Sequence, residues 1–243
     1  MANWSDPRTA SSAPYAARAG SRDAAYDAGL RSYMLSVYNY MASGVLLTGI
    51  VALLFAQSGM AQAVLGSSLR WVIALAPLGF VMVMSFGMNK LSTGALQALF
   101  WSFAAVMGLS MSSIFFVYTG ASIAITFFAT TVAFLSLSLY GYTTKRNLSG
   151  LGTFLIMGLV GLIVASLANL WFQSPVMSLV ISAIGVLLFA GLTAYDTQRI
   201  KSMYDYVAGT DMMGKVVIMG ALSLYLDFVN MFQFLLSFMG SRD

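Results

Sequence analysis

The chain has 243 residues, of which 59% are hydrophobic and only 8% are charged, and its net charge is +4. An ordinary soluble domain has about 25% charged residues, so this composition lacks the polar surface that a water-soluble protein needs. The chain contains no His, Cys or Glu, which excludes imidazole acid–base chemistry, thiol nucleophiles, disulfides and nearly every zinc site. The composition predicts an integral membrane protein, and the modest positive charge gives no indication of nucleic-acid binding.

The first 30 residues differ from the rest because they are small, polar and charged. They lack the apolar core of a secretory signal peptide. We therefore expect residues 1–30 to form a disordered polar tail and residues 31–243 to form the transmembrane domain. Arginines among several serines also occur in mitochondrial transit peptides, but the aspartates of this segment argue against that alternative.

Seven later stretches are long and apolar enough to cross a bilayer, which takes about 20 residues of helix. In chain order they cover residues 34–56, 71–88, 94–118, 121–140, 151–172, 176–195 and 216–239. Very few residues separate the third stretch from the fourth and the fifth from the sixth, so we expect each of these pairs to form an antiparallel hairpin. The predicted fold class is an all-α membrane protein with seven transmembrane helices.

The positions of Lys and Arg predict how the helices are oriented. Basic residues occur in the N-terminal segment and in the second, fourth and sixth loops, whereas the first loop has only Arg70 and the third and fifth have none. Cytoplasmic loops of membrane proteins carry an excess of Lys and Arg. We therefore expect the N-terminus to lie in the cytoplasm.

Small residues at helical spacing predict where helices touch. Ala104, Gly108 and Ser112 recur every four residues on the third stretch, and Gly161 and Ala165 do so on the fifth. Small side chains let helix backbones approach closely within a membrane, where no hydrophobic effect drives association. We expect both faces to be helix–helix contacts.

Two aspartates are the main candidate functional residues. Asp227 lies in the middle of the last stretch, and Asp196 lies where the sixth stretch ends. Ionisable residues inside membrane segments are costly and mark functional sites. If the two carboxyl groups meet near the cytoplasmic side, they would share a proton and sense pH. When both are ionised they could bind Ca²⁺ transiently, with Asn230, Thr197, Tyr195 and backbone carbonyls adding oxygen ligands.

Structural roles remain open for both acids. Asp196 could face water at a helix end and pair with Arg199 or Lys201, and Asp227 could be a neutral, hydrogen-bonded core residue. The helical rise also places Asp227 roughly 10 Å deeper than Asp196 if both helices start where the apolar stretches do. The two acids meet only if the last helix begins outside the membrane or if one helix is displaced.

Four sequence motifs carry a resemblance to a known family. They read SIFFVYTGASI at 113–123, SLYGYTTKR at 138–146, GLTAYDTQ at 191–198 and LSLYLDFVNMF at 222–232. With these motifs in this order, the chain resembles the Bax inhibitor-1 family, and within it the bacterial inner-membrane members, over roughly residues 31–242. The resemblance implies a seven-helix fold in which the last helix is central and surrounded by the other six.

The same resemblance implies a function. Members of the family are pH-sensitive Ca²⁺ leak channels of membranes, not enzymes, and hold no tightly bound cofactor. The positions of their di-aspartyl sensor match Asp196 and Asp227. In a relative, an Arg at the end of the second helix latches one of these aspartates, and this chain has Lys90 there. Lys supplies the positive charge but not the bidentate fork of Arg.

Two other functions remain as alternatives. Intramembrane aspartyl proteases also use a Tyr-Asp pair, which Tyr195 and Asp196 match. Their second motif, Gly-x-Gly-Asp, reads Leu224-Tyr225-Leu226-Asp227 here, and no Pro follows Pro175. The other alternative is a non-conducting protein that binds and modulates a membrane protease. The expected partners are the lipid bilayer, Ca²⁺ or H⁺, and, under this alternative, a membrane protein.

Overall fold

The computed structural model describes residues 13–241, with side chains described from residue 24 onward. Within that range the chain is helical and contains no strand. The elements in chain order are α1 (Ala13–Gln57), α2 (Met60–Leu65), α3 (Leu69–Gly87), α4 (Thr93–Met111), the 3₁₀-helix η1 (Ser112–Phe116), α5 (Gly120–Thr143), α6 (Ser149–Phe172), α7 (Pro175–Val207) and α8 (Met213–Met239).

Seven helical segments of the described chain are long and apolar enough to cross a membrane, which confirms the predicted fold class. Each coincides with one predicted stretch, and the third consists of α4 together with η1. The short helix α2, in the first loop, was not predicted. The largest difference in length is in α1, which begins at Ala13 instead of residue 34, and α7 also continues to Val207, well beyond the predicted end at residue 195.

The first helix begins earlier than the predicted boundary at residue 31. Residues 13–30 belong to α1, and an alanine-rich segment favours that conformation. Leu30 is buried, and the Tyr26 hydroxyl donates a hydrogen bond to the carboxylate of Asp205, near the end of α7. The Tyr26 ring also contacts the Tyr204 ring edge-on. Residues 1–12 of the predicted tail lie outside the described residues.

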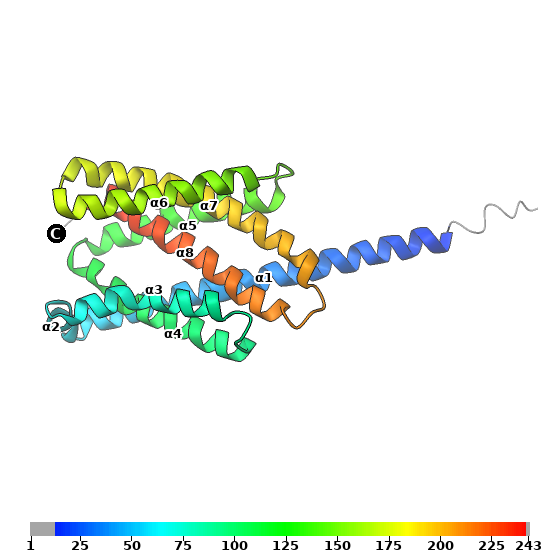
Figure 1. Ribbon diagram of the computed structural model, residues 1–243, viewed down its shortest axis with the longest axis horizontal. Helices are drawn as coiled ribbons and strands as arrows, with labels where there is room; N and C mark the ends of the chain where they lie inside the picture. Colours follow the sequence, from blue (N-terminus) through cyan, green and yellow to red (C-terminus); the bar gives the residue numbers. More distant parts are fainter. Residues whose placement is uncertain (1–12, 242–243) are drawn as a thin grey trace, which may run out of the picture.

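The helices form two groups with α8 between them (Figure 1). On one side α4 packs against both α1 and α3, and on the other α7 packs against both α5 and α6. The main contacts of α8 are with α1, α4, α5 and α7, and 72% of its apolar window is buried, against 11–39% for the other six segments. The prediction that all six other helices surround α8 is not confirmed, because α3 and α6 pack chiefly on α4 and α7.

Only one of the two predicted hairpins forms. Helices α6 and α7 pack side by side, and Asn169 stabilises their turn by donating to the Ser178 hydroxyl and accepting from the Ser174 backbone N–H. The prediction for α4 and α5 is wrong, because their principal contacts are with other helices and they lie in different groups. The intervening η1 redirects the chain, so a short connection here joins two helices that diverge (Figure 1).

Small residues make the close helix contacts, but only some of those predicted. Ala104 is fully buried, and a Cβ on Gly108 would collide with the Thr48 carbonyl and with Val51 on α1. On the fifth stretch the prediction is wrong for Gly161, where a Cβ would meet open space, whereas Ala165 is partly buried and packs against the core. The close approach in that group is instead at Gly141 of α5, where an added Cβ would collide with the backbone carbonyl oxygen of Ala194 on α7.

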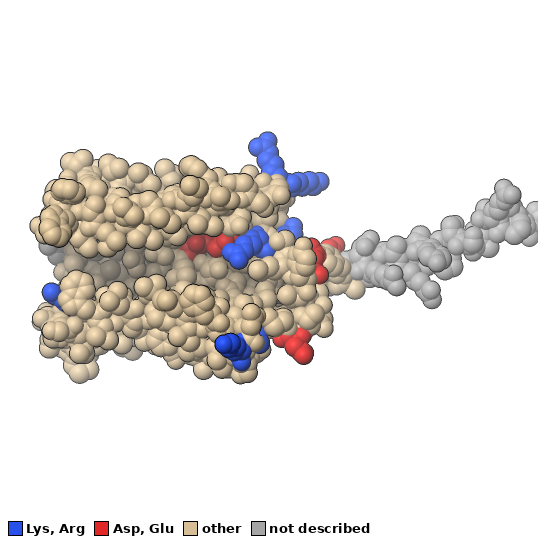
Figure 2. All heavy atoms as spheres, viewed as in Figure 1, with Lys and Arg blue, Asp and Glu red and all other residues tan. Residues whose placement is uncertain are grey.

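Basic side chains gather at one end of the bundle. The loops after α3, α5 and α7 lie at the same end as the N-terminal part of α1, and α8 ends at the opposite side (Figure 1). Figure 2 shows that most of the Lys and Arg side chains on this face lie at that end. This alternation fits seven crossings, and the assignment of the basic end to the cytoplasm stays a prediction.

The glycine contacts predict a matched pair of stability effects. Gly141→Ala should lower the free energy of unfolding by about 1–3 kcal/mol, because the added methyl group must push α5 away from α7. Gly161→Ala should be neutral or slightly stabilising, because the same methyl group enters open space and Ala favours helix. Denaturant unfolding of both variants in detergent measures the difference, and equal effects would contradict the α5–α7 contact.

Candidate functional site

The two helices that carry the aspartates are joined by a short turn at the basic end of the bundle. Gly209 in this turn has φ +73°, a conformation that other residues rarely adopt. Asp196 lies 11 residues before Val207, at the end of α7, and Asp227 lies 14 residues after Met213, at the start of α8. At 1.5 Å per residue, the two acids lie about 16 Å and 21 Å from the turn, so their levels differ by about 5 Å instead of the predicted 10 Å.

Asp227 is buried in the centre of the bundle. Its exposed fraction is 4%, and its Oδ2 atom has no hydrogen-bond partner in the structure. Its neighbours on α8, Leu224, Phe228 and Met231, are also buried. A charge in such surroundings carries a large desolvation cost unless it is paired, and an unsatisfied buried oxygen adds to that cost. The site therefore favours the neutral acid or the arrival of a cation.

Asp196 lies closer to water. Its side chain is 14% exposed, and its Oδ1 atom is 3.9 Å from Nη1 of Arg199, whose side chain is 54% exposed. This is the one ion pair within the described part of the chain, and its length and exposure make it weak. The two predicted acids thus lie on α7 and α8, which pack against each other, at levels that differ by about 5 Å along the helices.

Figure 2 shows acidic atoms inside the hollow between the two helix groups, beside a basic side chain. The hollow opens toward the face shown. Acidic side chains thus lie inside an otherwise apolar bundle.

Among the other predicted site residues, Arg199 pairs with Asp196, whereas the described contacts of the others do not include either acid. Lys90 is exposed after the end of α3 and forms no ion pair in the described structure. The Asn230 side-chain N–H donates to the Leu226 carbonyl of its own helix. The Tyr195 ring packs against Gly152 of α6. The cation that the structure places at Asp196 is Arg199.

A row of hydroxyl groups beside Asp196 was not predicted. The Thr197 hydroxyl donates to the Thr193 carbonyl at 2.7 Å and therefore accepts from the Ser138 hydroxyl at 3.0 Å. Because the Ser138 proton is used in this way, Ser138 in turn accepts from the Tyr38 hydroxyl. The row links α7, α5 and α1. Hydroxyl residues inside apolar spans were the available sequence signal, but their spacing alone does not reveal which of them meet.

A second pair of hydroxyl groups ties α8 to α1 and α4. The Thr48 hydroxyl donates to the Ala104 carbonyl at 2.8 Å, so the Tyr225 hydroxyl donates to Thr48 at 2.6 Å. Both side chains are buried. Tyr225 is two residues from Asp227, so this pair fixes the rotation of α8 next to the buried acid.

Gln198 holds the loop between α5 and α6 against α7. Its Oε1 atom accepts from the Leu148 backbone N–H, and its Nε2 atom donates to the Arg146 carbonyl, both at 2.8 Å. Gln198 belongs to a family motif, but its role was not predicted. It places the basic Lys145–Arg146 loop beside Arg199, where these three residues line a polar pocket of about 400 Å³.

The chemistry available to the acid pair is limited to protons and hard cations. No group of three or more His, Cys, Asp or Glu occurs among the described residues. Two carboxylates can share a proton or give a cation part of its oxygen coordination, whereas a tight Ca²⁺ site supplies six to eight oxygens. The arrangement thus suits reversible binding rather than storage of a metal ion.

Comparisons with known proteins match nearly the whole chain. The family model described as "Inhibitor of apoptosis-promoting Bax1" matches residues 30–243. Inner membrane protein YbhL of Escherichia coli is 47% identical over 88% of this chain and 94% of its own length. An uncharacterized protein of Rickettsia prowazekii is 45% identical over 91% and 94%. An uncharacterized membrane protein of Streptococcus pyogenes is 36% identical over 89% and 96%.

The hydroxyl row predicts measurable coupling between α1 and α5. Tyr38→Phe and Ser138→Ala should each destabilise the bundle, because each removes one partner of the same hydrogen bond. In the double variant the costs should fall short of their sum by about 0.5–1.5 kcal/mol. Unfolding measurements on the double-mutant cycle test this. Fully additive costs would show that the two hydroxyls do not interact.

Proposed function

The chain belongs to the Bax inhibitor-1 family of integral membrane proteins, and on this premise we propose that it is a pH-sensitive Ca²⁺ leak channel. Asp196 and Asp227 act as its pH sensor. The observation that carries the proposal is the buried, unpartnered Oδ2 atom of Asp227 on the most buried helix, with a second acid, Asp196, on the adjoining helix α7.

The location of the pair supports a role in gating. The two acids lie on α7 and α8, which pack closely along their length, and α8 also contacts α1, α4 and α5. A change of charge at Asp227 therefore acts on the helix that most of the bundle is built around. A ligand or proton shifts such an equilibrium only through a difference in affinity between the two arrangements.

The direction of the pH response follows from repulsion between like charges. When the pair holds a proton, one neutral acid and one carboxylate can remain close together, and the bundle stays closed. When both acids are ionised, repulsion and the need for hydration favour an arrangement that admits water and cations. The Ca²⁺ leak should therefore increase as the pH rises. Arg199 or another cation beside Asp196 favours the closed state.

Ca²⁺ is the expected cargo because the pair is a weak, oxygen-only site. Two carboxylates attract a hard cation, and with so few protein ligands the ion keeps much of its water and leaves readily. The bilayer is the environment of the seven spans. We further propose that the protein lies in a bacterial inner membrane with its basic end in the cytoplasm, in line with the name of the Escherichia coli relative.

Ca²⁺ flux into proteoliposomes is the direct test. Purified full-length protein should conduct Ca²⁺ more rapidly at about pH 8 than at about pH 6, because the shared proton is lost over such a range. Asp227→Asn and Asp196→Asn should each remove most of this pH dependence, since one carboxyl group then remains without its partner. Asp211→Asn is the matched control, because Asp211 is exposed in the turn between α7 and α8 and its loss should change nothing.

Other outcomes separate the alternatives. The sensor is wrong if both variants at the pair keep the flux and pH profile of the unaltered protein. Absence of flux at every pH, together with a membrane protease that co-purifies, would favour the non-conducting regulator. Cleavage of a membrane substrate that Asp227→Ala abolishes would favour the aspartyl protease.

A further inference from the structure

A groove runs along the bundle between α1 and α5. Helix α1 packs against α4 and α8, and α5 packs against α7 and α8. Both helices thus contact α8, and the groove lies between them. Two adjoining cavities, of about 470 Å³ and 380 Å³, form this groove and share Tyr38 and Leu135 as lining residues. Phe228 of α8 lines the second cavity.

The groove is apolar and opens sideways. Leu35 and Leu139, on opposite walls, are 51% and 63% exposed, and Leu46 and Leu135 are also exposed. These residues lie in membrane-spanning segments, so the opening faces lipid. An open apolar cavity at lipid depth is filled by whatever the bilayer supplies, which is an acyl chain.

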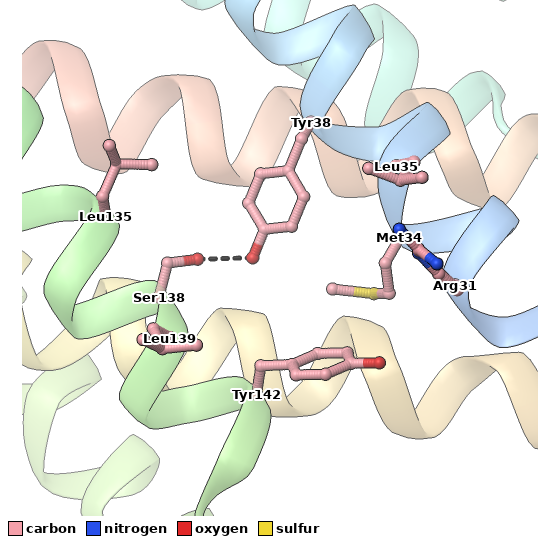
Figure 3. Close-up of a pocket in the computed structure, with 8 residues that line it drawn as sticks. All are labelled: Arg31, Met34, Leu35, Tyr38, Leu135, Ser138, Leu139 and Tyr142. Carbon is pink, nitrogen blue, oxygen red and sulfur yellow. Dashed lines mark hydrogen bonds between the residues drawn. The ribbon is translucent and has the colours of Figure 1, made fainter. Parts of the chain in front are cut away.

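One end of the groove is polar and carries a positive charge. Figure 3 shows Arg31 on α1 at the edge of the first cavity, with Tyr142 extending from α5 toward α1 and the Tyr38 hydroxyl reaching Ser138 across the gap. Arg31 is the one charged residue that lines either cavity. It is exposed and forms no ion pair with Asp27, one turn earlier on α1, or with any other acid in the described structure.

A second cation near the groove, Lys201, contacts Tyr142. The Lys201 ammonium donates to the Tyr142 carbonyl at 2.8 Å and lies 4.6 Å from the centre of the Tyr142 ring. The acid nearest in sequence to Lys201 on its own helix face, Asp205, accepts a hydrogen bond from Tyr26. The guanidinium of Arg31, which no described acid pairs with, lies at the mouth of the groove (Figure 3).

The groove is long enough to hold one lipid chain. At 1.5 Å per residue, Arg31 and Leu46 are about 22 Å apart along α1. One leaflet of hydrocarbon is about 15 Å thick. A chain that starts from a headgroup beside Arg31 can thus lie along the whole first cavity and into the second. Basic pockets between transmembrane helices are known to bind anionic headgroups.

We propose that the groove between α1 and α5 binds one anionic phospholipid, with an acyl chain along its apolar walls and the phosphate on Arg31. The lipid occupies the space between two helices that α8 and the Tyr38–Ser138 hydrogen bond otherwise join. This site does not depend on the proposed Ca²⁺ leak, because it needs neither Asp196 nor Asp227.

Native mass spectrometry of the purified full-length protein tests the proposal. Phosphatidylglycerol and phosphatidylcholine with identical acyl chains serve as the probes. One phosphatidylglycerol should bind more tightly than phosphatidylcholine, and Arg31→Gln should weaken its binding about fivefold, since one cation at the headgroup is lost. Arg31→Lys should retain the preference. Arg70→Gln is the matched control, because Arg70 lies at the other end of the bundle over the Trp71 ring and should have no effect.

A second variant tests the acyl chain separately. Leu135→Trp fills the part of the groove that both cavities share and keeps Arg31, so it should weaken binding of both lipids. Unaltered binding to this variant would overturn the groove as the site. Equal losses in Arg31→Gln and Arg70→Gln would also overturn the proposal, because the preference would then reflect general surface charge. Size-exclusion profiles that match the unaltered protein show that each variant is folded.

Discussion

The burial of one carboxyl group constrains how the rest of this bundle can behave. Asp227 lies on α8, whose apolar window is far more buried than that of any other span, and its Oδ2 atom has no partner. An isolated ionised carboxylate is not stable in such surroundings. The acid must therefore stay neutral, acquire a cation or move toward water, and each of these outcomes acts on α8 and on the helices that contact it.

The surrounding structure fixes the position of Asp227 but gives its Oδ2 atom no hydrogen-bond partner. The Tyr225–Thr48 hydrogen bond fixes α8 against α1 and α4, and close contact at Gly141 brings α5 against α7 beside Asp196. Asp196, with its weak link to Arg199, lies between the buried acid and the basic end. Close helix contacts thus surround two acids, Asp196 and Asp227, whose carboxyl groups have few partners. Such carboxyl groups can gain or lose a proton when the pH changes.

Hydropathy predicted the seven spans because the signal is summed over about 20 residues, and an error at one position hardly matters. The length of α7 was missed because its last turns are polar and leave the membrane, yet those turns bring Asp196 to nearly the level of Asp227. Helix pairing was harder to predict. Lipid and protein interior are equally apolar, so composition does not distinguish the buried Gly141 from the outward-facing Gly161.

The two acids of the candidate site and the pairing of Asp196 with Arg199 were among the predictions, but the neighbouring hydroxyl groups were not. Ionisable residues are rare in apolar spans, so Asp196 and Asp227 were conspicuous in the sequence. Lys90 was chosen by analogy, whereas Arg199 pairs with Asp196 because it lies three residues further along the same helix. The row from Tyr38 through Ser138 to Thr197 joins three helices. Only the three-dimensional arrangement could reveal it, because hydroxyl residues are common in membrane helices.

The central claim is that Asp196 and Asp227 act as one proton-sharing pair, and their separation tests it most directly. Experimental structures in lipid at about pH 6 and about pH 8, where the pair is expected to hold and to lose its proton, would measure the distance between the two carboxyl groups. We predict that the groups are within about 4–6 Å of each other at the lower pH and move apart at the higher pH. A separation beyond about 6 Å at both pH values would contradict the account, because charges that far apart do not share a proton.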